Sequence, residues 1–199
     1  MKIAVHHKIV VLGTLGLLVV PVAVAASTST ATTTINSTIS PVISLLTTSG
    51  TVNLNVTPTS AGAQTTASDT VTISTNDSAG YTLKLAGTTT NTSLVYGSNN
   101  ITAISGTMAA PVVLTSGTWG YRVDSAGGFG AGPTVVLSSA AIGALTYAGV
   151  PSSATPTTLA TTATTASNAV TTVWYSTADN YAVPSGTYTQ QVTYTVTTN

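Results

Sequence analysis

Few side chains of this 199-residue chain could take part in chemistry. Cysteine and glutamate are absent, and both histidines, His6 and His7, lie close to the N-terminus. Beyond residue 26, side-chain charge comes only from Lys84, Arg122, Asp69, Asp77, Asp124 and Asp179. General acid–base catalysis uses a group whose pKa lies near the working pH, most often His or a Glu of raised pKa. We therefore expect no enzymatic activity and no cofactor.

The four aspartates are the candidates for binding a cation, because calcium prefers carboxylate and carbonyl oxygens. They are spread over the chain without a D-x-D-x-D cluster, and Asp in turn sequences usually accepts hydrogen bonds from nearby backbone amides. Transition metals would need imidazole or thiolate ligands. We expect no metal site. Two basic residues cannot neutralise a run of phosphates, so we also expect no nucleic-acid partner.

Aromatic side chains are the remaining candidates for ligand binding. Trp174, Tyr175 and Tyr181 could stack on sugar rings, as in a carbohydrate-binding module. Trp174 and Tyr175 are neighbours, so they would face opposite sides of a strand, with one of them near the surface. The alternative is that Trp119 and Trp174 are large core residues in a chain with a single Phe. Trp174, Tyr175 and Tyr181 are thus the ligand-stacking candidates.

Residues 1–26 have the features of a secretory signal peptide. Lys2 and Lys8 supply the positive end, residues 9–20 are apolar, and Ala23 and Ala25 place small residues at the positions that a signal peptidase recognises. Cleavage after residue 25 or 26 would leave no membrane contact. The alternative is a retained anchor, since the apolar run approaches the length of a membrane span. Both interpretations predict an extracellular protein at the cell surface.

The rest of the chain predicts a β protein. Residues 27–34 are almost entirely Ser, Thr and Ala and form a linker. From residue 35 to 199, apolar residues recur with the period of two that is typical of strands, as in Val71 and Ile73 and in Leu83 and Leu85. We expect one all-β domain over residues 35–199, an antiparallel β-sandwich of roughly eight to ten short strands without a substantial helix. The turn at residues 76–80 predicts a hairpin between its flanking strands.

Five Asn residues stand in glycosylation sequons: Asn36, Asn55, Asn76, Asn91 and Asn100. Export would permit their modification. A chain this rich in Ser, Thr and Asn would contain about three sequons by chance. The excess is too small to predict glycosylation, so the sequence leaves it open.

The N-terminal alternating segment is the main functional candidate. Ile35, Ile39, Ile43 and Leu45 share one parity and directly follow the linker. In fibres built by strand exchange, the terminal strand of one subunit completes the sheet of its neighbour. These four residues are the donor-strand candidates. The alternative is that they form the first strand of the chain's own sandwich.

Several motifs resemble those of a known family. Residues 118–124 (TWGYRVD), 127–130 (GGFG), 148–153 (AGVPSS) and 184–194 (PSGTYTQQVTY) resemble exported Ser/Thr-rich β-sandwich surface proteins of ultrasmall candidate-phyla bacteria. The resemblance implies a cell-surface β domain. The layout of the chain is also similar to that of donor-strand subunits of pili and archaeal threads.

These observations predict a secreted structural or adhesive protein of the cell surface, pilin-like and assembling into fibres through its N-terminal strand. Its partner would be a second copy of the chain. The alternative function is a displayed carbohydrate-binding module, whose partners would be glycans at the surface of a cell.

Overall fold

The computed structural model describes residues 26–199, so the predicted signal peptide lies outside the described residues except for its last position. The described chain divides into a short N-terminal segment, residues 26–38, and a domain, residues 39–199. Residues 26–38 form neither helix nor strand. Among the described residues, no helix is long and apolar enough to cross a membrane.

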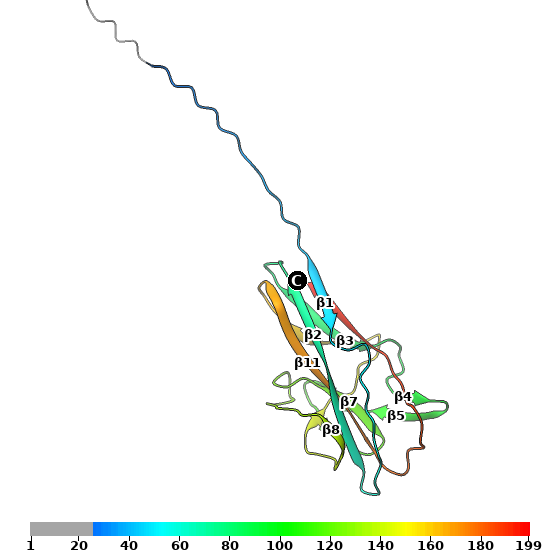
Figure 1. The fold of residues 1–199 in the computed structure, drawn as a ribbon. Coiled ribbons are helices and arrows are strands. Elements are labelled where there is room, and N and C mark those ends of the chain that lie inside the picture. The colour runs from blue at the N-terminus through cyan, green and yellow to red at the C-terminus, as the bar shows by residue number, and fades with distance from the viewer. Residues whose placement is uncertain (1–25) are drawn as a thin grey trace, which may run out of the picture. The chain divides into compact units, whose positions relative to one another are not determined.

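Residues 39–199 form an all-β, sandwich-like fold of twelve strands (Figure 1). The strands are β1 (Ile43–Thr47), β2 (Ala63–Thr75), β3 (Tyr81–Gly87), β4 (Leu94–Tyr96), β5 (Asn99–Ala103), β6 (Val112–Val113), β7 (Thr118–Arg122), β8 (Leu137–Ala140), β9 (Thr146–Tyr147), β10 (Thr157–Thr161), β11 (Ala166–Asp179) and β12 (Val192–Thr198). The predicted fold class is confirmed, but the expected number of strands was too low. Strands of two residues, such as β6 and β9, are too short to show alternation in the sequence.

The strands form one large sheet and two smaller ones. The large sheet has the order β1-β2-β11-β7-β5-β4, with β8 also paired to β2. The small sheet has the order β10-β3-β12, and β6 pairs with β9. All pairs are antiparallel except β5 with β7, where Thr102 lies opposite Thr118. The predicted antiparallel arrangement therefore holds for every pair but one.

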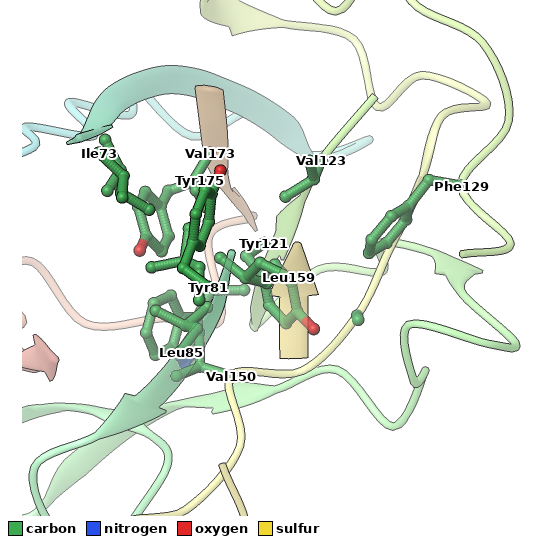
Figure 2. Close-up of a cluster of buried hydrophobic side chains, with 14 of the residues drawn as sticks. Ile73, Tyr81, Leu85, Tyr121, Val123, Phe129, Val150, Leu159, Val173 and Tyr175 are labelled. Atoms are coloured by element: carbon green, nitrogen blue, oxygen red, sulfur yellow. The ribbon is translucent and has the colours of Figure 1, made fainter. Parts of the chain in front are cut away.

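The hydrophobic core contains side chains from the large sheet and the small sheet. Val71 and Ile73 of β2 and Val173 of β11 are fully buried, as are Leu83 and Leu85 of β3. Figure 2 shows the labelled members of this cluster gathered into one group. Because successive strand residues point to opposite faces, the predicted alternation at Val71 and Ile73 corresponds to their burial. Removing this apolar surface from water is the main stabilising contribution to the fold.

The predicted hairpin between residues 71–75 and residues 81–85 is wrong, because β2 belongs to the large sheet and β3 to the small one. The turn between them is nevertheless well formed. Asp77 Oδ1 accepts a hydrogen bond from the Ala79 amide (2.9 Å), and Gly80 has a φ of 84°. A Cβ atom on Gly80 would collide with the Thr162 carbonyl. The turn therefore carries the chain from one sheet to the other. The residues of the turn fit a hairpin and a connection between sheets equally well, so the local sequence does not tell the two apart.

Candidate functional site

The N-terminal segment, residues 27–42, is extended and exposed wherever the structure describes it. It forms no strand, and the side chains of Ile35 and Ile39 are 89% and 82% exposed. Val42 is also exposed. Two of the four donor-strand candidates thus lie in a segment that presents large apolar side chains to solvent.

The other two donor-strand candidates, Ile43 and Leu45, lie in β1. Ile43 lies opposite Thr75 of β2 and Leu45 lies opposite Ile73, and both side chains are half-buried against the core. The alternative, a first strand of the chain's own sandwich, therefore holds for these two residues. The structure separates the predicted donor strand into a free part and a part that is already paired.

Residues around position 42 explain where the ladder ends. The Asn76 side chain accepts a hydrogen bond from the Val42 amide (2.6 Å) and donates one to the Ser40 carbonyl (3.1 Å). Thr75 Oγ1 donates to the Val42 carbonyl (2.8 Å). Pro41 has no amide hydrogen and cannot extend the pairing of β1 with β2. The exit point of the N-terminal segment is thus held by side chains at the end of β2.

The three ligand-stacking candidates lie in three different environments. Tyr175 is buried, and its hydroxyl is 2.8 Å from that of Tyr194. Trp174 lies on the opposite face of β11 and is half-buried. Tyr181 follows the end of β11 and is 74% exposed. Tyr175 is therefore not accessible to a ligand, and the three rings do not form one platform.

A groove of about 530 Å³ lies beside Trp174. One wall comes from β11, where Thr172 and Trp174 line it, and another from β10, through Leu159 and Ala160. Val123 and Asp124 also line the groove, directly after the end of β7. Polar and apolar groups contribute about equally to its lining. The sequence of single strands did not predict the groove, because it is formed by segments far apart in the chain.

The carboxylate in this groove is already paired. Arg122, which is 1% exposed, donates from Nε to Asp124 Oδ1 (2.7 Å) and to Thr134 Oγ1 (2.9 Å). The Thr134 amide donates to Asp124 Oδ2 (2.8 Å). Burial by itself would raise the pKa of Asp124, but the hydrogen bonds from Thr134 and Arg122 outweigh it and hold this pKa below the usual 3.8. The pair connects β7 to the loop after it and leaves little free charge in the groove.

The other aspartates are also occupied locally. Asp69 accepts hydrogen bonds from Thr48 Oγ1 (3.0 Å) and the Ser49 amide (3.1 Å). Asp179 accepts one from Thr177 Oγ1 (3.2 Å). In the part of the chain that the structure describes, no group of three or more His, Cys, Asp or Glu side chains could hold a metal ion.

A buried polar cluster lies between β2, β9 and β11 and was not anticipated from the sequence. Gln64 Nε2 donates to Tyr147 Oη (3.1 Å) and to Ser176 Oγ (2.9 Å), while Thr66 Oγ1 lies 2.8 Å from Ser176 Oγ. Gln64 Oε1 accepts from the Gly143 amide (2.9 Å). The cluster brings no base to the Ser176 hydroxyl, and its side chains satisfy one another. Its role is to satisfy polar groups inside the sandwich.

All five sequon asparagines are exposed, so their side chains are open to solvent. Asn76 differs from the others because its amide group holds both Ser40 and Val42. Attachment of a glycan to Asn76 Nδ2 would disturb the contact with the Ser40 carbonyl. Glycosylation at Asn76 would therefore loosen the exit point of the N-terminal segment.

Comparison with known proteins adds no functional assignment. No protein-family model, no curated protein and no solved structure matches this chain. The function is therefore inferred from the residues and geometry of the chain itself.

Proposed function

We propose that this protein is an exported structural or adhesive component of the cell surface, a pilin-like subunit whose copies join through residues 27–42. The observation that supports this proposal is the exposure of Ile35 and Ile39 on an extended segment, directly before β1, that pairs with no strand within residues 26–199. Burying two Ile side chains would contribute about 3–6 kcal/mol, because each contributes roughly 1.5–3 kcal/mol. That free energy is available to a contact between copies.

The composition of the segment agrees with this kind of joint. Residues 27–42 carry no charged side chain, so association would depend on apolar burial and on main-chain hydrogen bonds. Interactions between charges weaken with salt, whereas these contributions do not depend on charge. Assembly should therefore persist at high ionic strength.

The test compares two double variants of the chain over residues 27–199. Ile35→Asp with Ile39→Asp places charge on the apolar face of the segment, and Asn36→Asp with Thr38→Asp places the same charge on its other face. Light scattering after gel filtration and electron microscopy should show assembly for the wild type and the control, and monomers for the Ile variant. Wild-type protein that stays monomeric at every concentration, or an Ile variant that assembles normally, would refute the proposal.

A carbohydrate-binding module is the second candidate, and one observation favours it: Trp174 is partly exposed beside a groove of about 530 Å³. A glycan array would test it with Trp174→Ala and, as a control on the other exposed ring, Tyr181→Ala. Binding that disappears in Trp174→Ala while circular dichroism stays unchanged would support this function. If no polysaccharide changes the Trp fluorescence, this second function is refuted.

A further inference from the structure

The edge of β11 is only partly covered in the large sheet. β2 pairs with β11 from Ala166 to Asp179, whereas β7 pairs on the other side only from Trp174 to Ala178. Between Ala166 and Val173, no strand within residues 26–199 pairs with β11 on the side of β7. Figure 1 shows β11 extending past β7 towards the end of the domain where β1 begins. Because alternate residues of an antiparallel strand direct both N–H and C=O to each side, this edge presents unpaired backbone groups.

The groove beside Trp174 lies at this uncovered edge. Thr171 and Thr172 of β11 line it, Leu159 and Ala160 of β10 form the facing wall, and Val123 follows the point where β7 stops. Val123 and Leu159 are themselves 7% and 4% exposed. The volume of about 530 Å³ falls within the range of ligand clefts, roughly 300–1,000 Å³. The groove therefore combines an unpaired backbone edge with apolar side chains on two sides, at the position beside β11 that β7 leaves open.

We infer that this groove accepts residues 35–39 from a second copy of the chain, which precede the anchored residues 40–42. The donated residues would pair with β11 on the side of β7, beyond the point where β7 stops. The inference rests on the proposed function and names its acceptor. Ile35 and Ile39 lie on one face of an extended segment about 13 Å apart. A bulge interrupts β11 between Ala166 and Ala169, and the regular part of the uncovered edge, from Ala169 to Val173, is also about 13 Å long at roughly 3.3 Å per residue. The donor therefore fits the length of the edge.

The chemistry of the donor matches that of the groove. Asp124 is the only charged residue lining the groove, and it is bound to Arg122 and Thr134. The donor segment is uncharged and apolar on one face.

A glycan is the less suitable occupant. Sugar recognition needs several polar side chains free to bond the ligand. Here Asp124 and Thr134 already bond to each other, with Thr134 Oγ1 2.6 Å from Asp124 Oδ1, which leaves mainly the hydroxyls of Thr171 and Thr172 for a sugar. An unpaired strand edge, by contrast, is complementary to another strand.

Disulfide trapping tests the inference cleanly, because the chain has no native cysteine. Ser37→Cys lies between the two donor isoleucines, and Ala160→Cys lies on the groove wall. The two single variants, carrying different affinity tags, are mixed under oxidising conditions. A matched mixture replaces Ala160→Cys by Thr195→Cys, an exposed position on β12 at the free edge of the small sheet. The Ala160 mixture should give about tenfold more mixed dimer, because docking raises the effective concentration of the two thiols.

The outcomes distinguish a wrong acceptor site from a wrong proposed function. Assembly of the wild type together with equal or greater trapping at Thr195 would overturn the groove and leave the proposed function intact. Wild-type protein that does not assemble would overturn both. In the double variant with Ser37→Cys and Ala160→Cys, a disulfide formed only within one chain would also overturn the inference.

A second variant tests the groove without cysteine. Ala160→Trp fills the space between β10 and β11, and it should abolish assembly while the thermal unfolding transition and the circular dichroism remain those of a folded protein. If Ala160→Trp folds and assembles like the wild type, the groove is not the acceptor. A polysaccharide that changes Trp174 fluorescence and also blocks trapping at Ala160 would assign the groove to carbohydrate instead.

Discussion

Tyr175 and Tyr194 join the two main sheets through a hydrogen bond between their hydroxyl oxygens, which lie 2.8 Å apart. Tyr175 belongs to β11 of the large sheet, and Tyr194 belongs to β12 of the small sheet. Burial raises the pKa of both hydroxyls above the usual 10.0. The bond therefore connects the layers inside the sandwich, where a lost partner is not readily replaced by water.

A double-mutant cycle at Tyr175 and Tyr194 should reveal this bond. Tyr175→Phe and Tyr194→Phe are each expected to lower the free energy of unfolding by about 1 kcal/mol, because each leaves one hydroxyl without its partner. The double variant should lose less than the sum, as both hydroxyls are then absent. Urea unfolding measures the three values, with Tyr181→Phe as an exposed control. Strict additivity would show that the hydroxyls do not interact.

We expect the protein to unfold at alkaline pH, when its buried tyrosines ionise. Burial raises the pKa of Tyr121 to about 12, and the pKa values of Tyr175 and Tyr194 are also raised. A raised pKa in the folded state contributes stability that is complete below pH 10, the unfolded value, and is lost as pH rises above it. Tyrosinate absorbance and circular dichroism, recorded together against pH, should change in one cooperative step above pH 10. Ionisation of these three tyrosines near pH 10 in a fully folded protein would contradict this expectation.

Asp179→Asn should stabilise the protein. Asp179 is 5% exposed, and its Oδ1 has no hydrogen-bond partner among the residues that the structure describes. Burial raises its pKa above the usual 3.8, although the bond from Thr177 opposes this. Removing the charge should increase the free energy of unfolding at neutral pH by about 1 kcal/mol, or roughly 2–4 °C in Tm. Asp77→Asn, in the turn after β2, is the control.

The pH dependence gives a second measure of the same residue. Because its folded pKa is raised, wild-type Asp179 contributes stability that increases as pH falls through that pKa and is complete below 3.8. The difference in Tm between wild type and Asp179→Asn should therefore shrink on acidification. A difference that stays constant between pH 7 and pH 3 would show that the carboxyl is not perturbed.

Arg122→Leu should destabilise the protein strongly. Its guanidinium binds Asp124, Thr134 and the carbonyls of Thr146, Gly130 and Ala131. Its removal leaves several buried acceptors without a donor, whereas Asp124, 25% exposed, stays partly solvated. We expect a loss of about 3 kcal/mol, at the low end for a buried ion pair. Chemical denaturation measures the loss.

The matched control for Arg122→Leu is Lys84→Leu, which removes an exposed cation from β3 and should change stability by about 0.5 kcal/mol or less. The loss in Arg122→Leu should also shrink at low pH. Asp124, whose pKa lies below 3.8, contributes stability that is present above that value and is lost as pH falls through its folded pKa. Equal effects of the two substitutions would contradict a role for Arg122 in holding the loop after β7.

The sequence by itself was sufficient for the fold class. Alternation at Val71 and Ile73 and at Leu83 and Leu85 predicted buried strand faces, and all four side chains are in the core. Period-two patterning predicts the face of a strand because it depends only on the residues of that strand. The scarcity of titratable groups is likewise a property of composition, so it needs no structure.

Tertiary structure alone decided which strands are partners. The alternation of Ile39 and Ile43 is the same in the sequence, yet one is exposed and the other pairs with β2. The groove beside Trp174 exists because β7 stops at Arg122 while β11 continues. Pairing joins segments more than a hundred residues apart, such as Gln64 and Ala178. Alternation specifies which face of a strand is apolar, but the hydrogen-bonding edges carry no side chains, so the choice of neighbour depends on the packing of the whole chain.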